Sequence, residues 1–216
     1  MIKAELRKQL VDIAKERQTK TDVSHDFQHV LRVCNVAEKI ADTVNADPEI
    51  VIPAALFHDI VVYAKNSPES QFENEESAEL AGEILSSVEG YPSEKIEAVK
   101  ACIRECSFSK GTLPSSLESS VLQDADRMDS VGAISIMRTF SSGGQMNRPL
   151  YDPEDPFCKG ENPPSTSVRL FYKRLLVVAD RMHTDYAREA AKRRADFTKR
   201  FLVQLGIELE ESGIVK

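Results

Sequence analysis

Residues 54–62 read AALFHDIVV, and in this run an imidazole and a carboxylate, His58 and Asp59, stand side by side among apolar residues. An unpaired carboxylate in such surroundings costs several kcal/mol or takes up a proton. Two arrangements relieve that cost: hydrogen bonds to neighbouring groups, or a metal ion shared by both side chains. The dipeptide alone favours the hydrogen-bonded pair, so the decision depends on whether other stretches bury polar groups in the same way.

The sequence on either side of this run predicts helices. Asp47-Pro48-Glu49 combines an N-cap, a first-turn proline and an acid at the positive end of the helix dipole. It predicts a helix that carries His58 and Asp59 and reaches about residue 64 or 65. Apolar residues at helical spacing predict two earlier helices, from residue 2 to about 18 and from the turn at 21–26 to about 44.

The rest of the chain follows the same pattern. Ser67-Pro68-Glu69 repeats the start signal and predicts a helix to about residue 88, whose acidic outer face we interpret as a solvated surface. No alternating strand pattern of useful length occurs, so the predicted fold class is all-α, a single-domain helical bundle. Further helices are expected over about 94–106, 117–140, 168–178 and 184–205.

The segment 141–165 interrupts the helical pattern with three glycines and five prolines. Irregular loops longer than about 12–15 residues are uncommon in compact domains and are often lids or binding loops. Disorder is the alternative, but Leu150, Tyr151 and Phe157 can pack, so we expect an ordered flap. The predicted organisation is one domain, residues 1–216, with a core at about 20–140, the flap at 141–165 and C-terminal helices at 166–208.

Composition narrows the function classes. The 216 residues carry a net charge of −7, which gives no electrostatic footprint for a nucleic-acid duplex. No apolar run approaches the ~20 residues of a membrane span, and the N-terminus has no signal-peptide core. We therefore expect a cytoplasmic protein without a membrane partner, either a monomer or a homodimer. The four cysteines read as reduced thiols; Cys102 and Cys106 could be half of a zinc site, but core packing is the favoured interpretation.

Two more predicted helices carry polar groups within apolar stripes. His29 lies in the stripe of the helix that ends near residue 44, and Asp126 in that of the 117–140 helix. With His58 and Asp59 they supply two imidazoles and two carboxylates, a ligand set for a divalent first-row metal ion. Each residue alone could be a hydrogen-bonded core group or a helix cap. That explanation would have to apply independently to three separate helices in a chain that has only four histidines. We predict a metal site with open positions for water and substrate.

The order of these residues resembles the HD-domain superfamily of metal-dependent phosphohydrolases, in particular its small stand-alone bacterial branch. The similarity includes HDFQHVLRV around His29, AALFHDI around the pair, QDADRMDSVGAISIMRTF around Asp126, and GGQMNRPLYDPEDPF. It implies a helical bundle with one divalent ion bound through His29, His58, Asp59 and Asp126. Mn²⁺ or Mg²⁺ is favoured, and Co²⁺, Ni²⁺, Fe²⁺ and Zn²⁺ stay open. It also implies hydrolysis of phosphate esters or anhydrides, commonly in nucleotides.

The chain departs from its relatives in two places. No histidine lies between residues 59 and 126, and Cys106 stands where relatives often have histidine. Both features argue against a second metal and against di-iron chemistry. Val61 and Val62 follow the His-Asp pair where some nucleotidase relatives carry an acidic residue, so that carboxylate has no obvious counterpart.

These features predict a metal-dependent phosphohydrolase that acts on a small phosphorylated metabolite, above all a nucleotide. Phosphate or pyrophosphate would be released by a metal-activated water. One alternative function is a metal-binding sensor or ligand-binding module with little catalysis. Another is a structural helical protein whose polar stripes merely pair, and chelation would leave the stability of such a protein unchanged.

Several cations could neutralise the charge of a phosphoryl group in such a reaction. Lys65 lies seven residues beyond His58, two turns along the predicted helix, and is expected both in catalysis and in substrate binding. His25, one turn before His29, could orient a ligand or act as a general acid. The candidate catalytic groups are Asp59, Lys65 and His25, and the candidate substrate-binding residues are Arg32, Lys65, Arg127 and Arg148.

Overall fold

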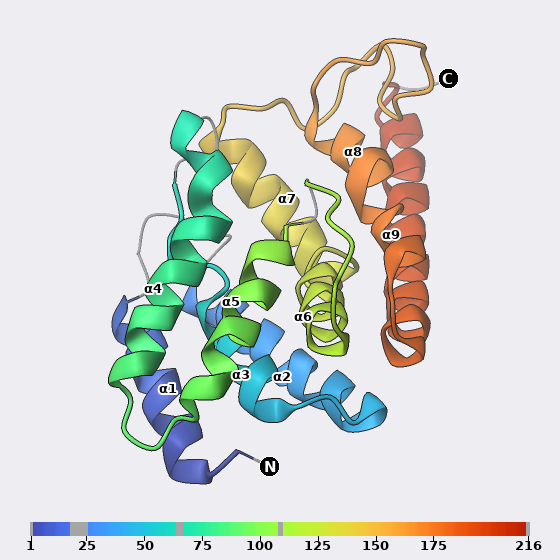
Figure 1. Cartoon of the computed structure of the whole chain (residues 1–216). Coiled ribbons are helices and arrows are strands. Elements are labelled where there is room, and N and C mark those ends of the chain that lie inside the picture. Colours follow the sequence, from blue (N-terminus) through green and yellow to red (C-terminus); the bar gives the residue numbers. More distant parts are fainter. Residues whose placement is uncertain (1, 18–25, 64–66, 108–109, 215–216) are drawn as a thin grey trace. The chain divides into compact units, whose positions relative to one another are not determined.

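The structure, a computed structural model, describes residues 2–17, 26–63, 67–107 and 110–214. Every regular element within these residues is helical, and no strand occurs among them (Figure 1). The prediction of an all-α fold is confirmed. The chain divides into two compact units, residues 1–128 and residues 129–216. None of the described helices is both long enough and apolar enough to cross a membrane.

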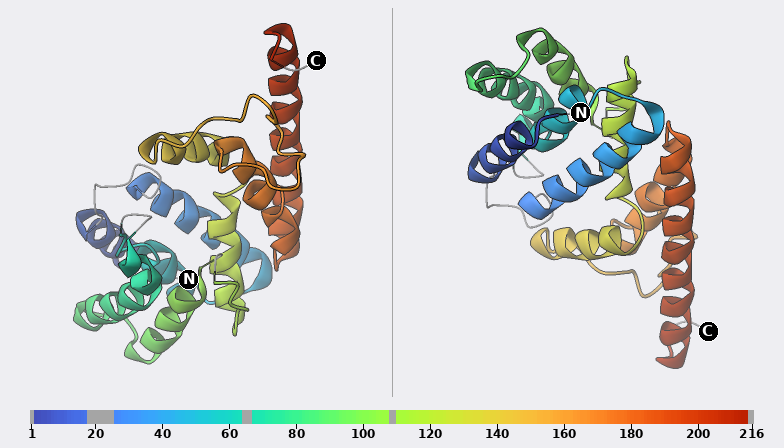
Figure 2. Two further views of the ribbon diagram at one scale, coloured as in Figure 1. Left: turned by 90° about the horizontal axis from the view of Figure 1, so that it is seen from above. Right: turned by 90° about the horizontal axis from the view of Figure 1, so that it is seen from below.

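The first unit is built around α3. This helix is apolar on all sides, and its residues from Val51 to Phe57 are all buried. It packs against every other α-helix of the unit, and α2 also runs beside α6, as both views of Figure 2 show. The α-helices of the unit are α1 (Ala4–Arg17), α2 (Phe27–Val44), α3 (Pro48–Phe57), α4 (Glu73–Ser87), α5 (Ile96–Glu105) and α6 (Leu117–Met128).

Two predicted helix starts are confirmed by their caps. The Asp26 side chain accepts a hydrogen bond from the backbone N–H of His29, which fixes the first turn of α2. The Asp47 side chain accepts one from the N–H of Glu49 and begins α3, with Pro48 in the first turn. The first cap also fixes the position at which His29 enters the core.

The predicted end of α3 is wrong. The helix ends at Phe57 instead of continuing to residue 64 or 65, and His58 is its C-cap. The backbone N–H of Val61 donates to Ser77 Oγ (3.1 Å) and that of Tyr63 to Glu73 Oε1 (2.7 Å). Side chains of α4 thus take the donors that a longer helix would have used internally. The argument that Lys65 shares a helix face with His58 therefore fails, and Lys65 itself lies outside the described residues.

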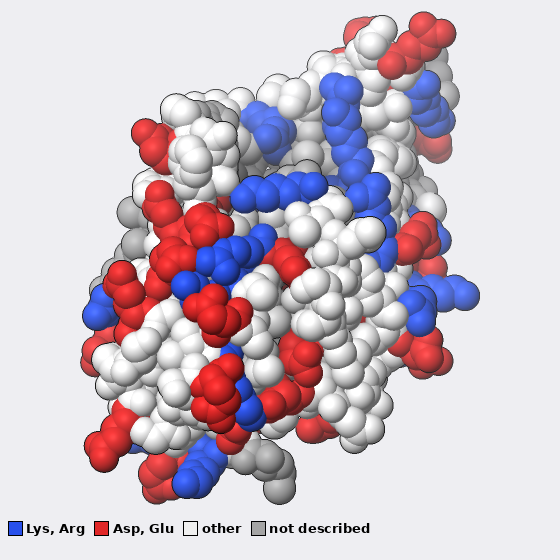
Figure 3. Space-filling model, viewed as in Figure 1, with Lys and Arg blue, Asp and Glu red and all other residues white. Residues whose placement is uncertain are grey.

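The acidic outer face of α4 was interpreted as a solvated surface. The side chains of Glu75 and Glu79 are indeed 57% and 52% exposed, and both also form ion pairs. Glu75 pairs with Arg104 of α5 (2.9 Å), and Glu79 pairs with Lys100 (2.9 Å) and Arg104. Figure 3 shows the red and blue side chains adjoining over these helices. The hydrogen bond from Lys100 and the charge of Arg104 hold the pKa of Glu79 below its usual range. The helix begins one turn later than expected, after the 3₁₀ turn Pro68–Phe72 (η1).

The expected helix over 117–140 is two helices. α6 ends at Met128, and α7 (Ala133–Gln145) begins after Gly132, whose φ of 90° and ψ of −157° break the helical path. Asp129, between the end of α6 and Gly132, forms an ion pair with Arg138 of α7 (2.9 Å). Because α7 continues to Gln145, the irregular segment begins at residue 146 instead of 141.

Replacing Gly132 by Ala is expected to destabilise the protein. The backbone at this position is one that essentially only glycine adopts, at a cost of about 1–3 kcal/mol for other residues. An added Cβ would also lie 2.9 Å from the Cβ of Arg194. Gly144→Ala is the control, since this helical glycine has no neighbour within 4 Å, and it should be neutral or stabilising by up to about 1 kcal/mol. Urea denaturation followed by circular dichroism measures both, and equal stabilities would contradict the prediction.

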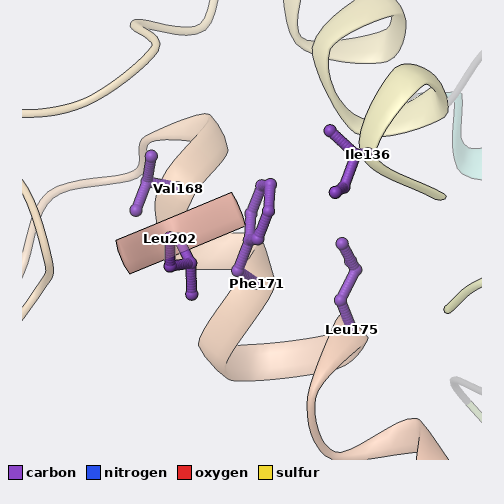
Figure 4. Packing of buried hydrophobic residues seen from close by; sticks show 5 residues of the cluster. All are labelled: Ile136, Val168, Phe171, Leu175 and Leu202. Atoms are coloured by element: carbon purple, nitrogen blue, oxygen red, sulfur yellow. The ribbon is translucent and has the colours of Figure 1, made fainter. Parts of the chain in front are cut away.

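The second unit packs α7 against α8 (Ser167–Leu170) and α9 (Asp185–Glu211). Between α8 and α9 lie the π-helical turn Phe171–Leu175 (η3) and the 3₁₀ turn Val178–Arg181 (η4). In the core, Phe171 lies between Val168 and Leu202 on one side and Ile136 and Leu175 on the other (Figure 4). α9 starts where expected, with Thr184 as its N-cap, and continues beyond the expected end at residue 205.

The irregular segment that follows α7 is anchored to this core. The carbonyl oxygens of Pro149 and Leu150 accept hydrogen bonds from the N–H groups of Ser167 and Val168 (2.8 and 2.9 Å). Tyr151 packs against the hydrophobic cluster, whereas the Leu150 side chain is exposed. The segment is therefore held by its own contacts within the second unit. That it acts as a flap stays a prediction.

Candidate metal centre

His58 is held at the end of α3 in a defined tautomer. Its Nδ1 atom lies 2.9 Å from the carbonyl oxygen of Ala55, one turn earlier. A carbonyl oxygen can only accept, so Nδ1 carries a proton, and in the neutral imidazole Nε2 keeps its lone pair. The side chain is buried, and Nε2 makes no hydrogen bond with any described residue.

The structure brings all four predicted ligands together. His29 Nε2 lies 3.5 Å from Asp59 Oδ2 and 3.6 Å from Asp126 Oδ1, and His58 Nε2 lies 3.4 Å from Asp59 Oδ2. The ligand atoms of His29, His58 and Asp126 are all within 4.8 Å of one another. The imidazole rings meet edge to face, with their centroids 5.3 Å apart. α2, the end of α3 and α6 thus converge on one point.

These residues fit a divalent metal ion. His58 Nε2 lies 3.4 Å from a carboxylate oxygen of Asp59, and a nitrogen lone pair and an anionic oxygen this close repel unless a cation lies between them. Bonds of about 2.0–2.2 Å at right or tetrahedral angles separate neighbouring ligand atoms by about 2.8–3.6 Å. The observed separations of 3.4–3.6 Å match that spacing. Two imidazoles and two carboxylates also form a donor set of intermediate softness, suited to first-row ions.

The centre is closed on one side and open on the other. His29 is fully buried and His58 nearly so, whereas the side chains of Asp59 and Asp126 are 27% and 18% exposed. Among the described residues, the carboxylate side of the centre is therefore the side more exposed to a ligand. This asymmetry is typical of a catalytic metal site, which keeps positions for water and substrate.

The residues predicted to bind the phosphate differ in their burial and in the unit to which they belong. Arg127 follows Asp126 on α6, is buried, and donates from Nη2 to Gln123 Oε1 (2.7 Å). Arg32 is half-buried on α2, one turn beyond His29. Arg148 belongs to the second unit, where its Nη2 lies 3.7 Å from the sulfur of Met146. His25 and Lys65 lie outside the described residues.

One buried residue of α6 was missed by the sequence analysis, and a second residue was assigned to core packing. Gln123 is fully buried on α6, one turn before Arg127. Apolar spacing gave no signal for its burial, because its neighbours one turn away on the helix, such as Ser119 and Arg127, are polar. Cys106 was considered as half of a zinc site and noted as standing where relatives often have histidine, but core packing was the favoured interpretation. Burial raises the pKa of its thiol, and the charges of Asp126 and Asp59 raise it further, so a neutral thiol forms part of the surroundings of the centre.

Comparison with known proteins identifies the family of this helical metal-site fold. The sequence model of the HD domain matches residues 26–131, which include all four candidate ligands. The protein YpgQ of Bacillus subtilis (strain 168), described as uncharacterized, is 32% identical over 206 aligned residues that cover 87% of this chain and 88% of YpgQ. The chain belongs to the HD-domain superfamily, and the predicted resemblance is confirmed.

Solved structures of bacterial proteins share the fold. The structure of B. subtilis YpgQ in complex with ADP has a TM-score of 0.71 and 29% identity, and covers 94% of this chain and 95% of its own. The Lin1889 protein of Listeria innocua has a TM-score of 0.75 and 27% identity, over 97% and 98%. An HD-superfamily hydrolase of Bacillus thuringiensis has a TM-score of 0.70 and 28% identity, over 95% and 97%.

Metal binding is expected to stabilise the protein. An ion that binds the folded centre and not the unfolded chain contributes about 2.7 kcal/mol at a concentration ~100 times its Kd. Chelator-treated protein should therefore melt at a lower temperature than the same protein with Mn²⁺ restored. Thermal denaturation followed by circular dichroism measures the shift. A melting temperature unaffected by Mn²⁺, Mg²⁺, Co²⁺ and Ni²⁺ alike would favour a polar cluster that merely pairs.

Proposed function

We propose that this protein is a metal-dependent phosphohydrolase acting on a small phosphorylated metabolite, above all a nucleotide. The observation that carries the proposal is the convergence of two imidazoles and two carboxylates, with His58 Nε2 3.4 Å from Asp59 Oδ2. A nucleotide is favoured because the related YpgQ has been crystallised in complex with ADP. Membership of a superfamily that contains hydrolases supports the reaction class.

In this proposal His29, His58, Asp59 and Asp126 hold one divalent ion, with Mn²⁺ or Mg²⁺ favoured. Such an ion, when bound, supplies Lewis-acid activation of water and of a phosphoryl oxygen. The hydrogen bond from His58 Nδ1 to Ala55 O keeps the imidazole in the ligating tautomer. The buried His29 side closes the centre to bulk water, and the carboxylate side admits the phosphate.

The chain also has to neutralise the charge that spreads over the phosphoryl oxygens. Arg127 is the first candidate because it is adjacent to Asp126 and its guanidinium is held in place. Arg32 and Arg148 are further candidates for substrate contacts. Lys65 and His25 keep the catalytic roles proposed for them on the sequence alone, together with Asp59.

The test is a metal-restoration assay. The purified protein is stripped with chelator, Mn²⁺, Mg²⁺, Co²⁺ or Ni²⁺ is restored singly, and a panel of nucleoside mono-, di- and triphosphates is offered. Released phosphate and pyrophosphate are detected separately. Metal-restored release of either product is expected, and the product distinguishes a phosphomonoesterase from a pyrophosphohydrolase. If neither phosphate nor pyrophosphate were released with any of the metals and nucleotides, the proposal would be overturned.

A second candidate function is a metal-dependent sensor or ligand-binding module. Val61 and Val62 favour it, because they place no carboxylate after the His-Asp pair where some nucleotidase relatives have one. In that case the protein with Mn²⁺ would bind ADP in calorimetry and release no product.

We place the protein in the cytoplasm, with neither a membrane nor a nucleic-acid duplex as partner. Its four cysteines are free thiols, three of them buried, which suits a reducing compartment. Whether it acts as a monomer or a homodimer is open, and sedimentation of the purified protein decides between them.

A further inference from the structure

Gln123 connects three separate parts of the first unit. Its side chain is fully buried on α6. The Nε2 atom donates to the carbonyl oxygen of Glu105, the last residue of α5 (2.7 Å), and to that of Thr112 in the following loop (3.1 Å). Both amide hydrogens are thereby used, so the orientation of the amide is fixed and Oε1 must serve as an acceptor on its other side.

The group that binds this oxygen is the guanidinium of Arg127. Its Nη2 donates to Gln123 Oε1 at 2.7 Å, across one turn of α6. Arg127 is only 6% exposed, and it follows Asp126 directly in the chain. A long cationic side chain is thus held by an amide that is itself tied to two backbone carbonyls.

Arg127 shares one turn of α6 with a candidate metal ligand. The neighbouring Asp126 has its Oδ1 atom 3.6 Å from His29 Nε2. The hydrogen bond to Gln123 therefore holds the Arg127 side chain along the turn of the helix that carries this carboxylate.

We propose that Gln123 is a positioning residue, which holds the Arg127 guanidinium beside the metal centre so that it can bind the phosphate of the substrate. The inference rests on the proposed function, in which Arg127 contacts that phosphate. A free arginine loses rotamer freedom when it binds an anion, and an arginine already held in place loses less. We call the hydrogen-bonded pair of Gln123 and Arg127 the clamp. Its loss should therefore weaken the binding of the substrate and leave the affinity for the metal ion unchanged.

The test is Gln123→Met, which keeps the length of the side chain and removes its hydrogen bonds. With Mn²⁺ present, ADP affinity measured by calorimetry should fall about tenfold, and the KM for any nucleotide that is hydrolysed should rise similarly. Mn²⁺ affinity should stay unchanged. Gln204→Met is the matched control, since this exposed amide donates to Glu208 at the same i, i+4 spacing on α9.

A double-mutant cycle separates positioning from a general loss of stability. If Gln123 acts through Arg127, then Gln123→Met should cause no further loss of ADP affinity in an Arg127→Met background. Should Gln123→Met lose its helical circular dichroism, Gln123→Glu takes its place. This variant keeps an acceptor for Arg127 but offers the carbonyls no donor, and its negative charge should also weaken ADP binding.

The outcomes distinguish this inference from the proposed function. Unchanged ADP affinity in the folded variant, or a full additional loss in the Arg127→Met background, would overturn the positioning role and leave the phosphohydrolase proposal standing. A wild-type protein that binds Mn²⁺ but neither binds ADP nor hydrolyses any nucleotide would overturn both.

Discussion

Asp126→Asn should weaken Mn²⁺ binding at least about a hundredfold and abolish metal-dependent turnover. The substitution preserves the shape of the side chain and replaces an anionic oxygen donor by a neutral amide. Even residues that only orient a metal ligand contribute about 10–100-fold to affinity, so loss of a charged ligand should exceed that range. Asp126 Oδ1 lies 3.6 Å from His29 Nε2, which is the spacing of two ligands on one ion.

His58→Ala should have an equally large effect for a different reason. It removes the nitrogen whose lone pair faces the Asp59 carboxylate, and leaves the carbonyl of Ala55 without the donor at Nδ1. Calorimetry with Mn²⁺ measures both variants, and the nucleotide panel measures their turnover. Asp42→Asn, an exposed change on the helix that carries His29, is the control and should bind Mn²⁺ normally. Full metal-dependent activity in either site variant would refute the ligand assignment.

The same Asp126→Asn variant distinguishes a metal site from a cluster that merely pairs. In a structural ion pair, removing one charge strands the other and costs about 3–5 kcal/mol. In a metal site without its ion, the two carboxylates and the imidazole lone pairs repel one another, and removing one charge relieves that repulsion. The unfolding free energy of Asp126→Asn in chelator should therefore be equal to or higher than that of the wild type.

The residues of the centre could be predicted because each broke a local rule. His29, His58 and Asp126 are polar groups within apolar helical stripes, and the stripes themselves predicted which face would be buried. The starts of α2 and α3 were equally readable, since the N-cap residues Asp26 and Asp47 act within their own first turn. The candidate ligands and the helix starts could both be read from residues that lie close together in the sequence.

The ends of the helices depended on partners far along the chain. α3 ends at Phe57 because the side chains of Ser77 and Glu73 accept hydrogen bonds from the backbone N–H groups that follow it. No feature of the sequence close to Phe57 predicts these acceptors. The break at Gly132 was not predicted for another reason. Apolar residues continue at helical spacing on both sides of Gly132, so the periodicity predicted one helix. The glycine itself was the one feature of the sequence that indicated a break.

The clamp between Gln123 and Arg127 lay beyond what spacing could show. Their i, i+4 relation was readable, but the two carbonyl acceptors come from the end of α5 and from the loop that follows it. Long-range hydrogen bonds of this kind are determined by how α5 and α6 pack, and the sequence pattern fixes only that each has an apolar face.

Phe171→Ala should cost about 3–5 kcal/mol of stability, the largest effect expected outside the metal centre. The ring is fully buried, stacks on Phe201 with centroids 5.6 Å apart, and is tilted against Phe140 at 5.9 Å. It is also the first residue of the π-helical turn that follows α8. Its removal leaves a cavity in a cluster formed by α7, α8 and α9, and these helices cannot all move in to fill it.

Urea unfolding followed by circular dichroism measures this loss, and Phe197→Ala is the control because that ring on α9 is 42% exposed. A cost below about 1 kcal/mol for Phe171→Ala would show that the cluster does not hold the second unit together. The same curves test the predicted single domain. If residues 1–128 and 129–216 unfold as one domain, Phe171→Ala shifts a single transition, and Mn²⁺ bound in the first unit shifts it back. If they unfold separately, the mutation moves only the transition that Mn²⁺ leaves unchanged.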